Sequence, residues 1–545
     1  MSVSFDRVPP VWTQNRFNSF LNDVETWINS GSAPANFVYP FSYIIKEVST
    51  GVYSAYNSQG VLVYGGANDL GTVNGEDVDA VIAAALQNLT SGRTWKERVI
   101  LEGSFTISLP IEMCSYTILD IYGKITAAND FPTNTGMIRN VTTEGAVTYL
   151  EVNCGLIDGN KTGVSGTYGT YGLTFGRQGS TDSADNVIIK NVVATNCKSH
   201  GIGIRPYTTN CWIENCVGSN CGLNGIDIMS DTESEETTTY NVWVTNCKTT
   251  GNARNGIDVS AVTSKVWVTN PTVTGNCTLN TVNDAGIVLS SDGDDVYVDN
   301  PIVYDNGVGT SPATFGIRLS GTGYKKVSGG RIFSSDTQLG AVGLRVFAGA
   351  TNSEVDGVKI QNMPNGIQLY YFGGEGVTNC KVSNCKIDSV ATGIKLFGSQ
   401  NCTVVNNVLS NCSVDGIIES DALGGTTDYN LYAANQLSDT VTDPLTIVGS
   451  NSKDYGYLPY VSPGYHFHVD ANIVELIDEA SGYYIFRYYV ASNRLVFAQG
   501  SAEYNGLDFV NAIAGRGLIV KTPDGAHTYR ISVNNSGTVI STLVS

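Results

Sequence analysis

The segments Asn224-Gly-Ile-Asp-Ile-Met229 and Asn241-Val-Trp-Val-Thr-Asn246 form one unit of a pattern that recurs along the chain. The first segment, in which glycine precedes alternating aliphatic residues, occurs ten times between Tyr171 and Glu419, at intervals of 23 to 31 residues. Alternating apolar residues at this period, without helical periodicity, predict a β-solenoid whose stacked coils bury each other's apolar faces. We expect parallel strands and a right-handed winding. The repeat glycines are Gly172, Gly201, Gly225, Gly256, Gly286, Gly316, Gly343, Gly366, Gly393 and Gly416.

The second segment of each unit ends in asparagine. Because side chains alternate across a strand, its Val and Ile residues are expected to point inward and its polar residues outward. Asparagine tolerates the left-handed conformation and bonds to neighbouring backbone, so this column predicts a ladder of corners with no role in chemistry. Its members are Asn191, Asn215, Asn246, Asn270, Asn300, Asn384 and Asn406.

Composition and charge narrow the class of protein. The 545 residues include 60 Gly, and the formal net charge is −19, with a pI near 4.6. Such an acidic chain is not expected to have nucleic acid or an anionic membrane as its main partner. No apolar stretch approaches the roughly 18 to 20 residues of a membrane span, and the start, Met1-Ser-Val-Ser-Phe-Asp-Arg7, lacks the pattern of a cleaved export signal.

Twelve cysteines fall mostly at repeat positions. Their placement predicts reduced thiols that fill the interior, because free cysteine behaves as a small buried hydrophobe. Pairs on stacked coils about 4.8 Å apart would also satisfy disulfide geometry, so pairing is the alternative.

The flanking sequences predict further units. Residues 1–70 are expected to form an N-terminal attachment region, with a helix at 17–29 and a hairpin within 41–64. Residues 71–443 are expected to form the solenoid, whose first coil is covered by an amphipathic helix at 76–89. Residues 444–464 contain three prolines and predict a linker, and 465–545 predict a small, aromatic-rich β domain.

The cap region and repeats resemble the pectate-lyase-like superfamily of right-handed parallel β-helices, an architecture that phage and archaeal-virus tailspikes also use. The segment Gly515-Arg-Gly-Leu-Ile-Val-Lys-Thr-Pro-Asp-Gly525 with Tyr529-Arg-Ile-Ser-Val533 is similar to C-terminal modules of viral tail fibres. The resemblance implies an all-β fold: a right-handed parallel β-helix of ten or more coils, with a small N-terminal α/β cap region and a small C-terminal β domain.

The same resemblance favours a virion tailspike or fibre that binds a host-surface polysaccharide, and it leaves open whether the protein also depolymerises that polysaccharide. It implies a virion or extracellular location, a homotrimer, and contact with a virion tail or baseplate through the N-terminal region. Two alternatives stay open, because the fold serves many functions. One is a free polysaccharide lyase or glycoside hydrolase, and the other is a non-catalytic adhesin or structural fibre.

Candidate site residues come from the position two after each repeat glycine, which is expected to face outward. It carries Asp227 and Asp258 on adjacent coils, where two carboxylates push one pKa up and leave an acid beside a base, as glycoside hydrolysis requires. The pair could instead hold Ca²⁺ in a lyase, or be solvated strand positions without function. No other cofactor is expected. The candidate substrate-binding residues on this face are Arg205, Arg318, Arg345, Tyr370 and Lys395.

A second outward column is aromatic, with Trp212, Trp243 and Trp267 followed by Tyr297. Such a ladder suits either sugar rings or a subunit interface, and the interface is slightly favoured. The acidic corner at 292–295 is a second place where Ca²⁺ could bind, although most acidic turns are only turns.

Overall fold

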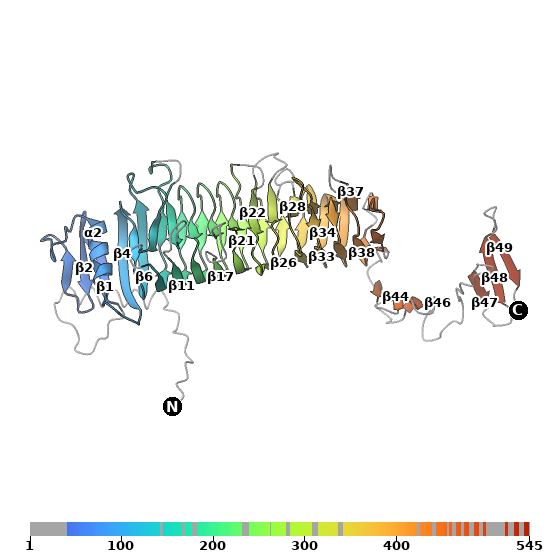
Figure 1. Cartoon of the computed structure of the whole chain (residues 1–545), viewed down its shortest axis with the longest axis horizontal. Coiled ribbons are helices and arrows are strands. Elements are labelled where there is room, and N and C mark those ends of the chain that lie inside the picture. The colour runs from blue at the N-terminus through green and yellow to red at the C-terminus, as the bar shows by residue number, and fades with distance from the viewer. Residues whose placement is uncertain are drawn as a thin grey trace, which may run out of the picture.

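The chain folds as a rod of stacked β coils, seen in a computed structural model (Figure 1). The structure describes residues 41–459, without 142–144, 166–168, 177–182, 231–238, 262, 280–283, 308–313, 336–341, 422–425, 439–442 and 455–456, and a set of strands beyond residue 464. The expected helix at 17–29 and most of the acidic segment at 230–239 lie outside the described residues. The expected fold class is confirmed.

Each typical coil contributes one strand to each of three faces. The first face contains β5 (Ile111–Met113), β7 (Gly136–Asn140), β10 (Tyr171–Phe175), β13 (Ile202–Ile204), β16 (Ile226–Met229), β19 (Ile257–Ala261), β22 (Ala285–Ser291), β25 (Phe315–Leu319), β28 (Val342–Phe347), β31 (Asn365–Tyr370) and β40 (Asp443–Thr446).

The second face contains β8 (Val147–Asn153), β11 (Ala184–Lys190), β14 (Thr208–Glu214), β17 (Tyr240–Thr245), β20 (Ser264–Thr269), β23 (Val296–Asp299), β26 (Lys325–Ser328), β29 (Glu354–Asp356), β33 (Lys381–Ser383), β36 (Thr403–Val405), β38 (Leu431–Ala433) and β41 (Lys453–Asp454). The third face contains β9 (Leu156–Asp158), β12 (Val193–Thr195), β15 (Val217–Ser219), β18 (Lys248–Thr250), β21 (Thr272–Thr274), β24 (Ile302–Tyr304), β27 (Arg331–Phe333), β30 (Lys359–Gln361), β39 (Asn435–Leu437) and β42 (Tyr457–Pro459).

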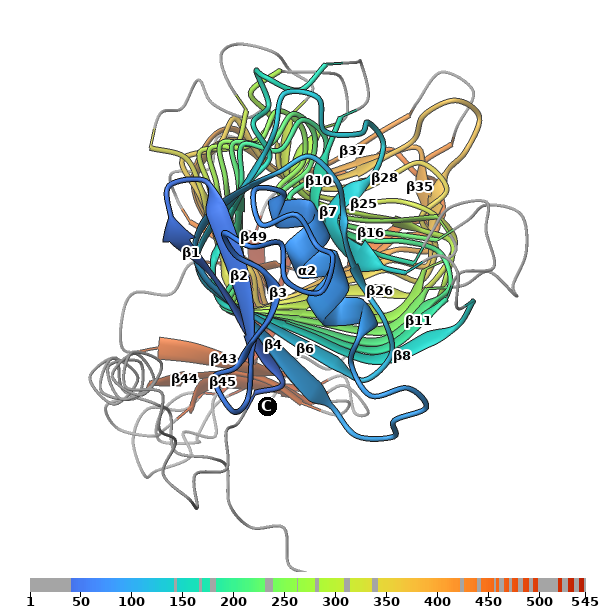
Figure 2. The same cartoon turned by 90° about the vertical axis from the view of Figure 1, so that its left-hand side faces the viewer.

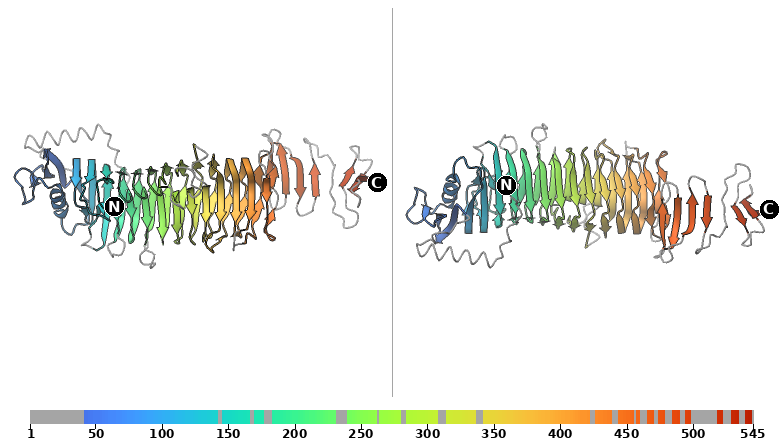
Figure 3. Two further views of the ribbon diagram at one scale, coloured as in Figure 1. Left: turned by 90° about the horizontal axis from the view of Figure 1, so that it is seen from above. Right: turned by 90° about the horizontal axis from the view of Figure 1, so that it is seen from below.

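A few strands cross from one face to another. The strands β34 (Lys386–Phe397) and β37 (Val408–Ser420) run continuously from the third face to the first, and β6 (Thr117–Ala127) pairs with both β8 and β9. A separate two-stranded sheet joins β32 (Val377–Thr378) to β35 (Ser399–Gln400). Seen from above and below, the coils follow one another along the rod axis (Figure 3).

The repeat glycines are required because the backbones of successive coils meet there. A Cβ built on Gly316 would lie 2.5 Å from the carbonyl oxygen of Gly343 and 2.6 Å from Cγ2 of Ile332. On Gly366 it would lie 2.4 Å from the carbonyl oxygen of Gly393. These contacts are shorter than any side chain tolerates, so only glycine lets the coils stack at this column.

The corner asparagines adopt the left-handed conformation, as expected, with φ from 50° at Asn270 to 57° at Asn406. On the exposed corner, Nδ2 of Asn300 donates to Oδ1 of Asn270 at 2.9 Å. A second, interior asparagine column was not expected. There, Nδ2 of Asn276 donates to Oδ1 of Asn306 at 2.9 Å and to backbone carbonyls, which satisfies buried polar groups of three successive coils.

The inward residues of the coils form one continuous apolar core that runs the length of the solenoid. All twelve cysteines are unpaired: ten are buried, and Cys114 and Cys154 are half-buried. The predicted position as interior filler is therefore confirmed for the ten buried cysteines.

The capping helix, α2 (Val78–Gln87), covers the open end of the first coils (Figure 2). Asp77 caps its N-terminus by accepting a bond from the Ala80 amide at 3.1 Å. Its buried side chains are the five apolar residues expected from the sequence, Val78, Val81, Ile82, Ala85 and Leu86. Beside it lie the antiparallel strands β1 (Tyr43–Ser49), β2 (Val52–Asn57) and β3 (Leu62–Gly65), and β1 joins the solenoid by parallel pairing with β4 (Glu97–Ile107).

The expected linker at 444–464 is wrong as far as residue 459. The strands β40, β41 and β42 pair in parallel with β37, β38 and β39, so one more coil is built after residue 443. Pro444 and Pro459 lie within terminal strands of the stack, where a missing N–H leaves no inner strand unpaired. The other domain boundaries stay predictions.

Beyond residue 464, the described strands form two antiparallel sheets. One holds β43 (Tyr465–Val469), β44 (Ile473–Asp478), β45 (Tyr484–Tyr489) and β46 (Arg494–Phe497), and the other holds β47 (Leu518–Lys521), β48 (Thr528–Val533) and β49 (Val539–Leu543). In the part of the chain that the structure describes, no helix is long and apolar enough to cross a membrane.

Candidate functional site

The position two after each repeat glycine forms an in-register row along the outer side of the first face. Asp227 on β16 pairs in register with Asp258 on β19, and Arg318 on β25 with Arg345 on β28. Pairing extends the row toward the N-terminus to Glu112 and Arg139, which the repeat pattern did not reveal. The row reads Glu112, Arg139, Thr174, Gly203, Asp227, Asp258, Val288, Arg318, Arg345, Gln368, Lys395 and Ile418.

Asp227 lies at the centre of a buried polar cluster. Its Oδ2 is 2.8 Å from Nη1 of Arg205, and its Oδ1 accepts from Nδ2 of Asn224 at 2.8 Å. The guanidinium of Arg205 lies over the ring of Tyr171, 4.7 Å from the centroid, and that ring stacks on His200 at 5.2 Å. Asp227 is only 3 % exposed, so its charge is held internally by Arg205.

Asn224 joins the two aspartates. Its Nδ2 also lies 3.1 Å from Oδ2 of Asp258, and that oxygen accepts a second bond, at 2.8 Å, from Nδ2 of Asn255. Asn224 and Asn255 are the residues immediately before the repeat glycines of their coils. The same asparagine amide therefore contacts both carboxylates.

The two carboxyl groups differ in acidity. Burial, together with the neighbouring charge of Asp227, raises the pKa of Asp258 to about 6. Burial also disfavours the charged form of Asp227, but the charge of Arg205, the charge that His200 carries when it is protonated at low pH, and the Asn224 bond lower the pKa of Asp227 below the usual value. Burial lowers the pKa of His200 to about 4, so His200 is neutral near pH 7 and Arg205 is the cation that keeps Asp227 ionised.

Two buried polar atoms of this cluster have no hydrogen-bond partner. They are Oδ1 of Asp258 and Nη2 of Arg205, a free acceptor and a free donor. Buried polar atoms are normally paired, and the exceptions concentrate at sites that bind water or ligand or do chemistry. Asp258 thus combines a pKa of about 6 with a carboxylate oxygen that accepts no hydrogen bond.

The expectation that the whole row faces solvent is wrong. Asp227 and Gln368 are almost fully buried, and so is Arg205, which lies beside the row two residues after Gly203. Val288 is 1 % exposed and belongs to a buried apolar cluster with Ala285 of its own strand and with Phe315 and Val342 of the next two coils. Ala285, Phe315 and Val342 each immediately precede a repeat glycine. Residues at this position lie on the same outer side as the row, and their side chains cover part of the row.

Arg345 and Tyr370, expected to bind substrate, are held by their neighbours. The guanidinium of Arg345 lies 4.3 Å from the ring centroid of Phe315 and 4.5 Å from that of Tyr370, and it donates to Oε1 of Gln368 at 3.1 Å. Burial lowers the pKa of Arg345 to about 10. Arg345 therefore braces the first face, whereas the half-buried Lys395, with Nζ 5.4 Å from the ring centroid of Phe397, retains contact with solvent.

The tryptophan ladder lies on the second face, away from the aspartates. Trp243 stacks between Trp212 and Trp267 at centroid distances of 4.9 and 5.2 Å, with the rings within 8° of parallel. Both faces of Trp243 are thus covered by neighbouring rings, and its edge points outward. A sugar ring stacks on a free aromatic face, so the sugar-stacking interpretation of this ladder is wrong for its central ring.

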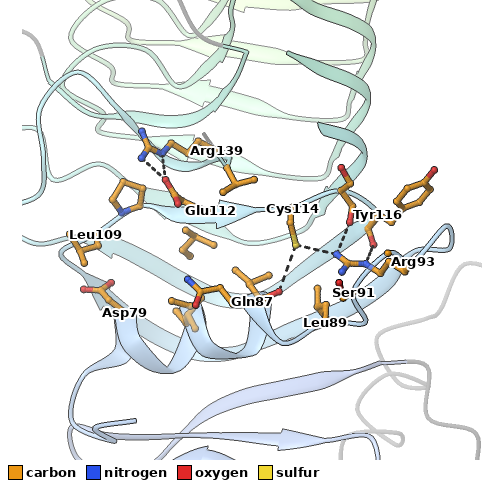
Figure 4. Close-up of a pocket in the computed structure, with 18 residues that line it drawn as sticks. Asp79, Gln87, Leu89, Ser91, Arg93, Leu109, Glu112, Cys114, Tyr116 and Arg139 are labelled. Carbon is orange, nitrogen blue, oxygen red and sulfur yellow. Dashed lines mark hydrogen bonds and ion pairs between the residues drawn. The ribbon is translucent and has the colours of Figure 1, made fainter. Parts of the chain in front are cut away.

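A cleft of about 890 Å³ lies at the N-terminal end, between α2 and the strand β5 (Figure 4). Its polar groups are paired: Nε of Arg139 donates to Oε1 of Glu112 at 3.1 Å, and Arg93 donates to the Ser115 carbonyl at 2.6 Å and to Thr117. The charged side chains Arg93, Glu112 and Arg139 of the cleft are therefore all engaged with neighbouring groups, and the aspartate cluster is the better candidate for chemistry.

The residues present do not fit a calcium ion. Both carboxylate oxygens of Asp227 are bonded, one to a guanidinium that would repel a cation. At the acidic corner, Asp292 and Asp294 accept backbone N–H bonds from Thr322 and Tyr324 at 3.0 and 2.9 Å. Among the described residues, no group of three or more His, Cys, Asp or Glu side chains is placed where it could hold a metal ion.

A rod of parallel coils with a polar row along one face defines the class of right-handed parallel β-helix proteins. The chain belongs to the family described as right handed beta helix region, whose profile matches residues 137–311 and 269–432, together more than half of the sequence. No curated protein matches the chain in sequence.

Three solved structures illustrate what the chain is similar to. The A-module of the Azotobacter vinelandii mannuronan C-5 epimerase AlgE4 is 19 % identical, with a TM-score of 0.50 over 70 % of this chain and 96 % of that one. A tailspike protein of E. coli bacteriophage HK620, in complex with a hexasaccharide, is 11 % identical over 96 % and 98 %, with a TM-score of 0.48. PfbA, a surface adhesin of Streptococcus pneumoniae, is 17 % identical over 63 % and 89 %, with a TM-score of 0.44. At these identities the similarity shows the fold alone.

Proposed function

We propose that this protein is a tailspike- or fibre-like protein that binds a host-surface polysaccharide along its first face and cleaves it at Asp258. The observation that carries the proposal is the pair Asp227–Asp258, in which one charge is fixed by Arg205 and the other group keeps an unpaired oxygen. The solved structures named above include a module of a mannuronan epimerase, which is consistent with a polysaccharide ligand.

In this proposal the two aspartates have different roles. A group with a pKa of about 6 exists in both protonation states near neutral pH, as efficient proton transfer requires. Asp258 is therefore the proton-transfer group. Asp227 has both oxygens engaged and cannot attack a sugar carbon, so it is a positioning residue whose charge raises the pKa of Asp258.

The half-buried cations suggest that the polysaccharide is acidic. Arg318 follows Asp258 two coils along the row, and Lys395 follows three coils later. The chain as a whole carries a charge of −19 and would repel an acidic polymer. Cations on this face would attract such a polymer locally.

The test is a glycan array of bacterial surface and plant polysaccharides, followed by turnover on the glycans that bind. Wild-type protein should bind a subset of acidic glycans and release reducing ends, and an accompanying absorbance from a new C=C bond would identify elimination rather than hydrolysis. Asp258→Asn should bind the same glycans and release no product. Asp299→Asn, which changes an exposed carboxylate of the second face, is the matched control. Absence of binding to any glycan would contradict the proposal.

We also propose a homotrimer whose N-terminal region attaches to a virion tail or baseplate. The half-buried tryptophan ladder, whose edges face outward, supports a subunit contact on the second face. Light scattering on the intact chain at micromolar concentration tests the assembly state. A monomeric mass would contradict it.

A further inference from the structure

A single exposed aromatic ring stands at the edge of the first face. Phe372 is 59 % exposed, which places it among the most exposed large apolar side chains of the described residues. It follows Tyr370, the last residue of β31, and therefore projects where the strand leaves the solenoid.

The backbone that carries Phe372 is a tight hairpin. The Phe372 amide donates to the Glu375 carbonyl at 3.3 Å, and the Glu375 amide donates back to the Phe372 carbonyl at 3.2 Å. Gly373 and Gly374 form the two-residue turn with φ of 67° and 97°, values that glycine adopts without strain. Two backbone hydrogen bonds thus hold the main chain that carries this exposed ring.

The ring of Phe372 also has one covered face. It stacks on Phe347 of β28 at a centroid distance of 5.5 Å and an interplanar angle of 27°. Among the described residues no second ring contacts Phe372, in contrast to Trp243 in the ladder of the second face. One face is therefore fixed by Phe347, and the exposed fraction leaves the other face open.

The surroundings of Phe372 match those of a sugar subsite. Apolar C–H groups of a sugar ring pack on an open aromatic face, and the covered face keeps the ring from turning. The stack continues from Phe347 through Tyr370 to Phe397, and Nζ of Lys395 lies over the last of these rings. An acidic sugar unit that contacts Phe372 would have this cation on the same face.

We propose that the open face of Phe372 is a second saccharide subsite of the polysaccharide site, an inference that rests on the proposed function. Between β19, which carries Asp258, and the strands β28 and β31 beside Phe372 lie three to four coil spacings of about 4.8 Å each, or roughly 14 to 19 Å. A monosaccharide cannot reach both places. The ligand is consequently a polymer that runs along the rod axis.

The experiment uses a size series of oligosaccharides prepared from the tightest-binding glycan of the array. Dissociation constants are measured in the Asp258→Asn background, so that cleavage does not consume the ligand. Phe372→Ala should weaken binding of the long oligosaccharides by about three- to tenfold and leave the shortest unchanged. Phe372→Trp, which restores an aromatic face, should recover the affinity. Tyr429→Ala removes an equally exposed ring, 58 % exposed and located before β38 of the second face, and should change nothing.

The two proposals fail in different ways. If no glycan binds, the proposed function fails and the subsite fails with it. If glycans bind and Phe372→Ala matches the parent protein at every oligosaccharide length, only the subsite is overturned. Circular dichroism and the thermal midpoint of each variant verify that the fold is intact.

Discussion

Replacing Asp258 with asparagine should make the protein more stable at pH 8 while removing its chemistry. In the folded chain, burial and the charge of Asp227 raise the pKa of Asp258 to about 6, compared with an ordinary value of 3.8. A group whose folded pKa is raised favours folding in its protonated form, and this contribution is lost as the pH rises through the folded value. Wild-type protein is therefore destabilised by ionisation of Asp258 above about pH 6.

The difference in pKa corresponds to at most about 3 kcal/mol at pH 8, because each unit corresponds to about 1.4 kcal/mol and partial exposure reduces the effect. At about 2.1 cal/mol/K per residue, a solenoid of roughly 400 residues should convert this into a rise of roughly 3 °C in the thermal midpoint. Asparagine is uncharged, so the advantage of Asp258→Asn should vanish at pH 4.

Thermal unfolding followed by circular dichroism at one fixed scan rate, at pH 4, 6 and 8, measures this difference. Asp299→Asn, an exposed carboxylate on β23, serves as the control and should show a smaller change between these pH values. A difference between Asp258→Asn and wild type that stays constant with pH would refute the reasoning, as would a variant less stable than wild type at pH 8.

Three other predictions concern the solenoid itself. Gly316→Ala should destabilise the chain by several kcal/mol or prevent folding, because the added Cβ would lie 2.5 Å from a carbonyl oxygen. Gly376→Ala is the control and should be tolerated, because the nearest atom to its added Cβ would be 3.4 Å away. The thermal midpoints of the two variants measure the difference. Lys325 is fully buried, and burial lowers its pKa to about 8. The stability of wild type relative to Lys325→Met should therefore increase as the pH rises from 8 to 10.5, because only the unfolded chain then binds the proton. A difference in denaturation midpoints that does not change with pH would contradict this. Asn276→Ala should cost about 2 to 3 kcal/mol because it leaves buried carbonyl and amide groups unpaired, more than Asn270→Ala at the exposed corner; equal losses in unfolding experiments would contradict the interior role.

The coil architecture could be predicted from the sequence because its determinants are local and periodic. The repeat glycines mark coil contacts, the corner asparagines mark left-handed turns, and the apolar residues of α2 show one buried face. The extra coil after residue 443 was missed because β40 to β42 are short and contain prolines, which at inner positions would exclude a strand.

The candidate site was predicted only in part, because alternation tells which side of a strand a residue occupies and not what covers it. The sequence brought Asp227 and Asp258 together correctly, and it missed that Asn224 bridges them. The signal was present, since Asn224 and Asn255 both precede a repeat glycine. The unpaired oxygen of Asp258 and the covered faces of Trp243 depend on side-chain directions, which no repeat pattern specifies.

The direct backbone contact at the repeat glycines keeps the spacing between successive coils constant along the rod. Since no side chain stands between Gly316 and Gly343, the step between neighbouring coils is set by peptide groups alone. The outer residues differ from coil to coil while the strands stay in register, as the succession of Asp258, Val288 and Arg318 illustrates. A polymer bound along the axis would therefore meet outer side chains at regular intervals, one coil apart. Its specificity would depend on which residues occupy those outer positions.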